Sequence, residues 1–210
     1  MKAKYAPIGI IFLLVCLMGL NLAVCEEIED MARGGDFENG NADKSFWTLQ
    51  IEGQAAATLT IDKKEAAVGK ASLFVEVLAI DNAAPWVPWI WQTQTVEGGE
   101  TYTLSVFLKA EEKRNIDLSI RDLAAPKQEH VIQSVQIGTE WEEFWATFTS
   151  PKDVDVKVGV RGGPAASYWI DGMRFYVGEY EPTEFGKVQK IAVAPVGKLA
   201  TAWASVKAQD

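Results

Sequence analysis

An alternation of apolar and polar residues runs through most of the chain and constrains its fold more than any other feature. In residues 154–161 every second residue is Val, and the residues between them are Asp, Lys, Gly and Arg. A period of two is typical of a β-strand that buries one of its faces. Comparable alternation occurs at 57–61, 71–77, 102–109, 115–121 and 144–149.

Turn signals separate these alternating segments. Glycine and proline clusters are typical of tight connections between strands. Such clusters occur at Glu97-Gly98-Gly99, Ser150-Pro151-Lys152-Asp153 and Gly162-Gly163-Pro164. Roughly eight or nine short strands joined in this way, with no long helical pattern, predict an all-β fold. We expect an antiparallel β-sandwich of the jelly-roll kind.

The composition allows one folded domain and argues against one class of partner. The chain has 210 residues, of which 48% are hydrophobic and 23% charged, which is enough for one domain with short ends. The formal net charge is -9. Because a negative surface repels phosphate backbones, we expect no nucleic-acid partner.

The first 25 residues have the pattern of a secretory signal peptide. Two lysines precede an apolar run over 8–20, and small residues then lead to Cys25 before two glutamates. We expect cleavage after Cys25 and therefore a secreted or cell-envelope protein. Two alternatives stay open: a lipoprotein box that ends at Cys25, and retention of the apolar stretch as a membrane anchor.

The rest of the chain divides into three parts. We expect a polar spacer over 26–34, the sandwich over 35–182 and a C-terminal tail over 183–210. Both cysteines lie in the leader, so the remaining chain has no disulfide. In the tail, Leu199 and Trp203 with Val206 have the spacing of a short amphipathic helix. Such a helix would dock on the sandwich or serve as a docking or sorting segment for a protein partner.

The sequence offers little material for catalysis. His130 is the single histidine, and no cysteine follows the leader, so nucleophilic devices that need a His or Cys partner are disfavoured. A glycosidase needs only two carboxylates. However, the E-x-D-x-x-E strand typical of jelly-roll glycosidases does not occur. We expect a protein that is not an enzyme.

Several motifs resemble, in order and spacing, those of carbohydrate-binding modules of the family 4/9/22 type, whose fold is also called galactose-binding-like. The first is Gly35-Asp36-Phe37-Glu38-Asn39-Gly40 with Trp47, which resembles the opening strand of that family. The match covers about residues 35–178. The later motifs are Gly69-Lys70-Ala71-Ser72-Leu73, residues 89–110, residues 141–148 and Tyr168-Trp169-Ile170-Asp171-Gly172-Met173-Arg174-Phe175.

The resemblance implies a structural calcium ion, Ca²⁺, where the first and last strands meet. Glu38 and Asp171 match the carboxylate positions of the family, and backbone carbonyls near Lys70 would complete the shell. Calcium prefers six to eight hard oxygen ligands, some of them carbonyls. Gly172 departs from the family pattern, which often has a second Asp there.

The resemblance also implies glycan binding, and the residues suggest how. Sugars are held by flat aromatic rings and by many fixed donors and acceptors. Three tryptophans fall within the six residues 86–91, and Trp145 should face outward from its strand. Each candidate could instead be ordinary core or solvated surface. The candidate glycan-binding residues are Trp86, Trp89, Trp91, Gln92, Gln94, Asp117, Arg121, Trp145 and Arg161.

These features together predict a secreted, non-catalytic carbohydrate-binding protein that holds a poly- or oligosaccharide by Trp stacking and side-chain hydrogen bonds. A structural or adhesion domain of the envelope that binds protein is the first alternative. An accessory component of a glycoside hydrolase is the second. Exposure of the Trp rings separates sugar binding from the first alternative.

Overall fold

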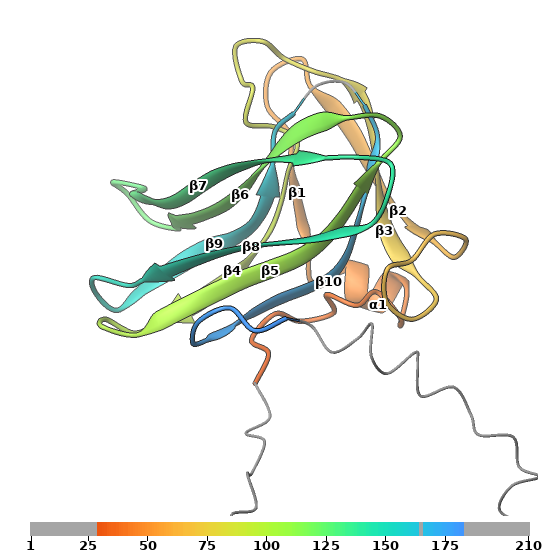
Figure 1. Cartoon of the computed structure of the whole chain (residues 1–210). Helices are drawn as coiled ribbons and strands as arrows, with labels where there is room; N and C mark the ends of the chain where they lie inside the picture. The colour runs from red at the N-terminus through yellow and green to blue at the C-terminus, as the bar shows by residue number, and fades with distance from the viewer. Residues whose placement is uncertain (1–28, 164–165, 183–210) are drawn as a thin grey trace, which may run out of the picture.

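Ten β-strands form two antiparallel five-stranded sheets in the described part of the chain, residues 29–163 and 166–182. Figure 1 shows the computed structural model, with the two sheets facing each other. From β3 to β10 the chain crosses between the sheets at every step except that from β6 to β7. The predicted all-β jelly-roll sandwich is therefore confirmed.

The first sheet has the strand order β1-β4-β9-β6-β7. All of its neighbouring strands pair antiparallel. Its members are β1 (Thr48–Gln50), β4 (Trp89–Val96), β9 (Val154–Arg161), β6 (Arg114–Asp122) and β7 (Glu129–Ile137).

The second sheet has the strand order β2-β3-β10-β5-β8. A bulge interrupts the pairing of β10 with β5 between Asp171 and Arg174. Its members are β2 (Ala56–Asp62), β3 (Ser72–Ala79), β10 (Tyr168–Val177), β5 (Thr101–Ala110) and β8 (Glu142–Thr149).

The core lies between the sheets and follows from the alternation in the sequence. Val156, Val158 and Val160 of β9 are buried, as are alternate apolar residues of β5. Tyr102 of β5 stacks on Phe175 of β10 with ring centroids 5.4 Å apart. Because alternate residues of a strand point to opposite faces, the odd-numbered residues of β9 are left on the outer side of the first sheet.

The opening motif is a turn and not the strand that we expected. Residues 35–40 form an irregular loop that leads into one helical turn, α1 (Asn41–Lys44). Phe37 is fully buried and has a φ of 54°, a left-handed conformation that a strand does not contain. The backbone N–H of Asn39 donates to the buried Asp43 carboxylate at 2.7 Å, which closes the loop onto α1.

The described residues before this loop are more than a spacer. The N–H of Met31 donates to the carbonyl of Phe175 in β10 at 2.7 Å. The N–H of Arg33 donates to the Gln92 side chain of β4 at 3.0 Å. This segment therefore binds to both sheets. In the ranges 29–163 and 166–182, no helix is long and apolar enough to cross a bilayer. The expected leader and the tail helix fall outside those ranges.

Candidate functional site

The outer face of the first sheet brings together most of the residues expected to bind a ligand. Strand alternation places Trp89 and Trp91 on this face, opposite the core residue Ile90. The register then builds three rows across the strands. They are Gln50-Trp89-Arg161-Asp117-Ser134, Thr48-Trp91-Gly159-Ser119-Ile132 and Thr93-Lys157-Arg121-Glu129.

The middle row is low because Gly159 lies at its centre. A Cβ at this position would come within 1.9 Å of the carbonyl oxygen of Ile90, so the close approach of β4 requires glycine. Ser119, its neighbour in β6, has a small side chain. Long side chains from the two flanking rows can therefore reach over the middle row and meet there.

Three cationic side chains surround the indole of Trp89. The guanidinium carbon of Arg121 lies 4.4 Å from a ring centroid of Trp89, and that of Arg161 lies 5.5 Å from it. The Lys157 Nζ lies 5.1 Å away. These are cation–π distances. Trp89 is completely buried, and the three cationic side chains cover its ring.

Trp91 is the ring of this pair that remains partly exposed. It is tilted against Trp89 with centroids 6.2 Å apart, and the Lys157 Nζ lies 3.8 Å from its ring. Lys157 also donates to Gln50 Oε1 at 3.1 Å. Gln50 donates in turn to Glu52, whose other oxygen accepts from Trp86 Nε1 at 3.2 Å. This chain of hydrogen bonds ties Trp86 to the edge of the face.

Several buried polar atoms of this face have no hydrogen-bond partner among the described residues. A buried donor or acceptor without a partner costs about 1–3 kcal/mol, so such atoms are rare in folded proteins unless a ligand or water satisfies them. Their concentration on one face is the strongest structural sign of a binding site. They are Trp89 Nε1, Trp91 Nε1, Ser119 Oγ, Arg121 Nε and Arg161 Nε.

Glu129 of β7 holds the two arginines in place. Its Oε1 accepts from Arg161 at 2.9 Å and lies 3.6 Å from Arg121. The arginine side chains are 7% and 16% exposed. Because the two arginines share one carboxylate, some N–H donors of each guanidinium group remain without a carboxylate partner. A ligand oxygen can accept hydrogen bonds from these donors.

Gln92 and Gln94, which we expected on this face, lie on the opposite side of β4. The Gln92 side chain pairs with the backbone N–H and carbonyl of Arg33, and Gln94 donates to the carbonyl of Met31 at 2.9 Å. Their even positions give them the orientation of Ile90 and not that of the tryptophans. They fasten the entering chain to the sheet and have no access to the outer face.

Trp145, another expected ligand residue, lies on the second sheet. It is 44% exposed, as an outward-facing residue should be. However, β8 is at the edge of the other sheet, and Trp145 stacks on Tyr180 with centroids 3.9 Å apart and planes 8° apart. The structure therefore does not bring Trp145 together with Trp89 and Trp91.

Several polar residues of the face were not expected from the sequence, among them Gln50, Ser119, Glu129 and Lys157. Lys157 and Ser119 could have been predicted from the alternation. Lys157 lies an even number of residues from Arg161 in the same strand, as Ser119 does from Arg121, so each pair points to one face. Glu129 is the first residue of β7, so no run of alternation precedes it to indicate its face. Its approach to two arginines depends on the pairing of β6 with β7, which the sequence does not state.

Glu38 and Asp171, the expected calcium ligands, converge on one loop. Glu38 Oε1 accepts from the N–H groups of Lys70 at 2.6 Å and Ala71 at 2.9 Å. Asp171 Oδ2 accepts from the N–H groups of Ala67 and Val68 at 2.7 and 2.8 Å. The two carboxylates clamp the turn before β3 against the last strand.

This donor set does not form a calcium shell as it stands. N–H groups point at the carboxylates, whereas calcium takes carbonyl and carboxylate oxygens. In residues 29–163 and 166–182 no three His, Cys, Asp or Glu side chains gather as a metal site. Burial, and then the Glu38 charge, raise the pKa of Asp171 to about 7, although backbone N–H bonds oppose this. The calcium ion stays a prediction.

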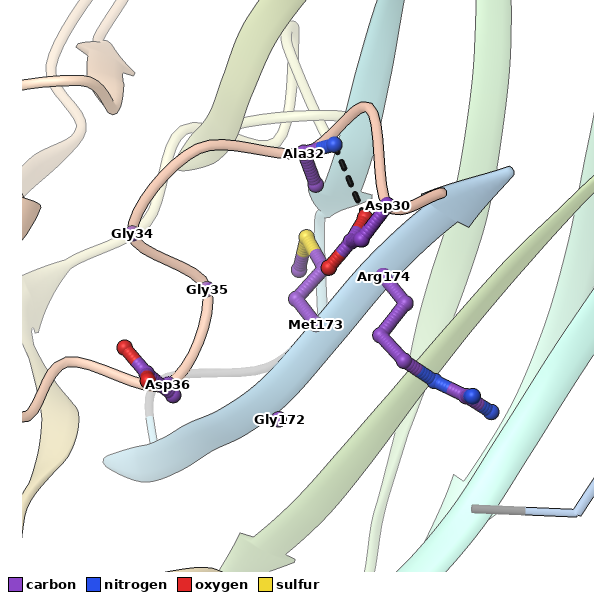
Figure 2. Close-up of a pocket in the computed structure, with 8 residues that line it drawn as sticks. All are labelled: Asp30, Ala32, Gly34, Gly35, Asp36, Gly172, Met173 and Arg174. Atoms are coloured by element: carbon purple, nitrogen blue, oxygen red, sulfur yellow. Dashed lines mark hydrogen bonds between the residues drawn. The ribbon is translucent and has the colours of Figure 1, made fainter. Parts of the chain in front are cut away.

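A small cavity of about 130 Å³ lies elsewhere, between the entering chain and β10. Figure 2 shows the loop from Asp30 to Asp36 beside the strand, with Met173 pointing toward the loop and Arg174 pointing away. The Asp30 carboxylate is used locally, since it accepts from the N–H groups of Ala32 and Phe175 at 2.8 and 3.0 Å. The cavity is lined by no aromatic residue and is separate from the outer face of the first sheet.

Comparison with known families agrees with the resemblance to carbohydrate-binding modules found in the sequence. The family model described as carbohydrate binding domain, of the 4/9 type, matches residues 30–167. The chain belongs to this family of carbohydrate-binding domains. The match includes the segment from residue 30 that binds both sheets, so this segment is part of the carbohydrate-binding module. No curated protein matches the chain.

Solved carbohydrate-binding modules share the fold. A family 4 module is 21% identical, with a TM-score of 0.52 over 63% of this chain and 86% of that one. The C-terminal family 22 module of Clostridium thermocellum Xyn10B is 18% identical, with a TM-score of 0.51 over 71% and 94% of the two chains. A xylan-binding domain of family 22 has the same identity and TM-score over 70% and 95%.

Proposed function

We propose that this carbohydrate-binding module is a secreted, non-catalytic protein that holds a poly- or oligosaccharide on the outer face of its first sheet. The Trp91 ring would stack on a sugar, and the surrounding side chains would hydrogen-bond to its hydroxyls. Trp89 would act as the floor that positions the cations. The sequence pattern of the leader supports secretion.

One observation carries the proposal: buried polar atoms without a described partner concentrate beside a partly exposed indole. Sugars present many hydroxyls on a ring whose faces are apolar, so a site for them combines an aromatic platform with fixed polar groups. The outer face supplies the Trp91 platform and, around it, Ser119 Oγ and the Nε atoms of Arg121 and Arg161.

The chemistry of the face supports a binding role without catalysis. Glu129 is occupied by Arg161 and Arg121. His130 is 4% exposed and bonds to Asp122, on the core-facing side of β6, so it is not presented to a ligand on the face. A glycosidase would need an acid and a base or nucleophile on either side of one sugar linkage.

The test is binding to a panel of soluble polysaccharides by affinity electrophoresis, followed by calorimetry on those that retard the protein. We expect at least one glycan to bind, and Trp91→Ala to weaken it about tenfold or more, the effect of one lost stacking contact. Trp145→Ala is the matched control, because it removes an exposed indole from the other sheet, and its affinity should match that of wild type.

Two results would contradict the proposal. If no polysaccharide in the panel retards the protein, a glycan is not its ligand, and the protein-binding alternative is favoured. Equal loss of affinity in Trp91→Ala and Trp145→Ala would show that the outer face of the first sheet is not the site. The expected docking of a protein partner through the tail is a separate prediction, outside the described residues.

A further inference from the structure

Resting on the glycan-binding function proposed above, we infer that the outer face of the first sheet selects acidic glycans, with a uronic-acid carboxylate contacting the cationic cluster Arg121, Lys157 and Arg161. A neutral glycan would use the Trp91 platform without using this cluster.

The cluster is unusual for a protein of this net charge. The whole chain has a formal charge of -9, yet three cations gather around the single indole of Trp89. Among the described residues, one carboxylate, that of Glu129, forms ion pairs with the cluster, and it serves both arginines. Lys157 has an uncharged hydrogen-bond partner, Gln50. Inside the cluster, positive charge therefore exceeds negative charge.

Other charged groups of the face surround the cluster and balance its charge only over the face as a whole. Asp117 lies beside Arg161 in the register, and Glu52 at the edge of the face accepts from Trp86 and Gln50. Lys127 adds a further positive charge that acts on Lys157. Asp155, two residues before Lys157 on the same side of β9, is exposed and accepts from Thr95 at 2.7 Å. Three more acids and one more cation make the face as a whole neutral, with the cations central and Glu52 and Asp155 toward its margins.

Burial and the neighbouring cations both disfavour the charged form of Lys157. Burial, and after it the charges of Arg121 and Lys127, lower the pKa of its ammonium group. A bound anion would favour the charged form and relieve this repulsion. Such an anion would reach Lys157 across the low middle row, where Gly159 contributes no side chain.

The donor geometry favours a carboxylate over a lone hydroxyl. Arginine presents planar, parallel N–H groups that match the two oxygens of a carboxylate. The Nε atoms of Arg121 and Arg161 are buried and have no partner in the described part of the chain. The Lys157 Nζ lies 3.8 Å from the Trp91 ring. A uronic-acid residue stacked on Trp91 would therefore place its carboxylate next to Lys157 and within reach of these arginine donors.

The test compares acidic polymers with their own neutral forms. Polygalacturonate, glucuronoxylan, alginate and hyaluronan are each titrated beside the same polymer after methyl esterification of its carboxyl groups. We expect at least one acidic polymer to bind about tenfold more tightly than its ester, and its affinity to fall as salt rises from about 0.05 to about 0.5 M. Dextran sulfate is included as a sulfated polymer.

Lys157→Met keeps an apolar stem over Trp91 and removes the charge. It should lower the affinity for the acidic polymer about tenfold while leaving the affinity for the ester unchanged. Lys109→Met is the matched control. Lys109 also lies over an indole, with Nζ 5.5 Å from the Trp169 ring, but on the second sheet. Its substitution should change neither affinity.

The outcomes separate this inference from the proposed function. Equal binding of acidic polymers and esters, or of neutral glycans alone, would overturn the inference and leave glycan binding intact. Equal or tighter binding of dextran sulfate would overturn the assignment to carboxylates. Binding of no polymer would overturn both. Selective binding of a carboxylated polymer that Lys157→Met weakens would support the inference.

Discussion

Arg121 stacks on Trp89, with its guanidinium carbon 4.4 Å from a ring centroid, although the two residues come from different strands that are not neighbours. Strand β9 runs between β4 and β6, and the contact forms over Gly159. The buried indole therefore belongs to the framework of the face, and the adjacent, partly exposed Trp91 is the ring to which we assign ligand binding.

This division of roles predicts different effects of two alanine substitutions. Trp89→Ala should lower the free energy of unfolding by about 3 kcal/mol, because it removes a fully buried ring. Trp91→Ala should change it by about 1 kcal/mol or less, while the affinity for the glycan falls about tenfold or more. Urea unfolding measures the first quantity and calorimetry the second. Similar destabilisation by both substitutions would contradict the assignment.

Glu129→Gln should strengthen binding of an acidic glycan about threefold at low salt, since it removes the carboxylate that competes for Arg121 and Arg161. The measurement is the dissociation constant for the acidic polymer that binds wild type most tightly. Glu142→Gln, an exposed change on the second sheet, is the control. Weaker binding of the Glu129 variant would show that Glu129 acts mainly by positioning the arginines.

Gly159→Ala should destabilise the sandwich by about 3 kcal/mol or more, because the new methyl group would collide with the backbone of β4. Gly138→Ala is the control, since a Cβ at that position meets nothing within 4 Å. Thermal unfolding of the two variants gives the comparison. Equal melting temperatures would mean that β4 and β9 do not approach as closely as described.

The buried Asp122 predicts a dependence of stability on pH. Its carboxylate binds His130 and Lys152 and is 2% exposed. Burial alone would raise its pKa, but the hydrogen bonds from His130 and Lys152 outweigh this and hold the pKa below the usual 3.8. Because the folded pKa is the lower one, the stability from this group is present above pH 3.8 and lost as the pH falls through the folded value.

Asp122→Asn should therefore lower the free energy of unfolding by about 2 kcal/mol at pH 7, and by less as the pH falls below the unfolded pKa. Urea unfolding at a series of pH values measures the difference between wild type and variant. Asp155→Asn, in an exposed pair with Thr95, should show a small difference at every pH. A difference for Asp122→Asn that stays constant into strong acid would contradict the argument.

Calcium provides a test of the Glu38 and Asp171 clamp. If the predicted ion binds there, adding calcium after chelation should raise the melting temperature by about 4 °C, and Asp171→Asn should remove the increase. Magnesium at the same concentration is the control, since it prefers a smaller octahedral site. Equal melting temperatures in calcium and chelator would leave the clamp as a set of backbone N–H bonds.

The sequence was sufficient for the sandwich because strand alternation is local information. Val154 to Val160 shows it most clearly, and the same rule assigns Trp91 and Lys157 to one face and Gln92 to the other. The same rule separates Gln92 and Gln94 from Trp89 and Trp91, so the expectation that they share a face was wrong. The expected strand at residues 35–40 was wrong because the left-handed Phe37 gives no signal in its residue type.

The rest of the site could not be predicted because it depends on which strands are neighbours. Trp145 alternates correctly and faces outward, yet its strand belongs to the second sheet, and no local pattern records that. The meeting of Arg121, Arg161 and Lys157 over Trp89 requires the register of β9 with both β4 and β6. These pairings join positions dozens of residues apart.

The two described ends of the module meet on β10. Asp30 accepts from the N–H of Phe175, and the N–H of Glu181 donates to the hydroxyl of Tyr176. Strand β10 is in the second sheet, and Figure 1 shows the first and last described segments leaving the sandwich at the same side. A domain or an engineered linker joined beyond residue 29 or residue 182 would therefore start beside β10, which is not a strand of the Trp91 face. We expect the module to keep its affinity for glycans when it is immobilised through either of these ends.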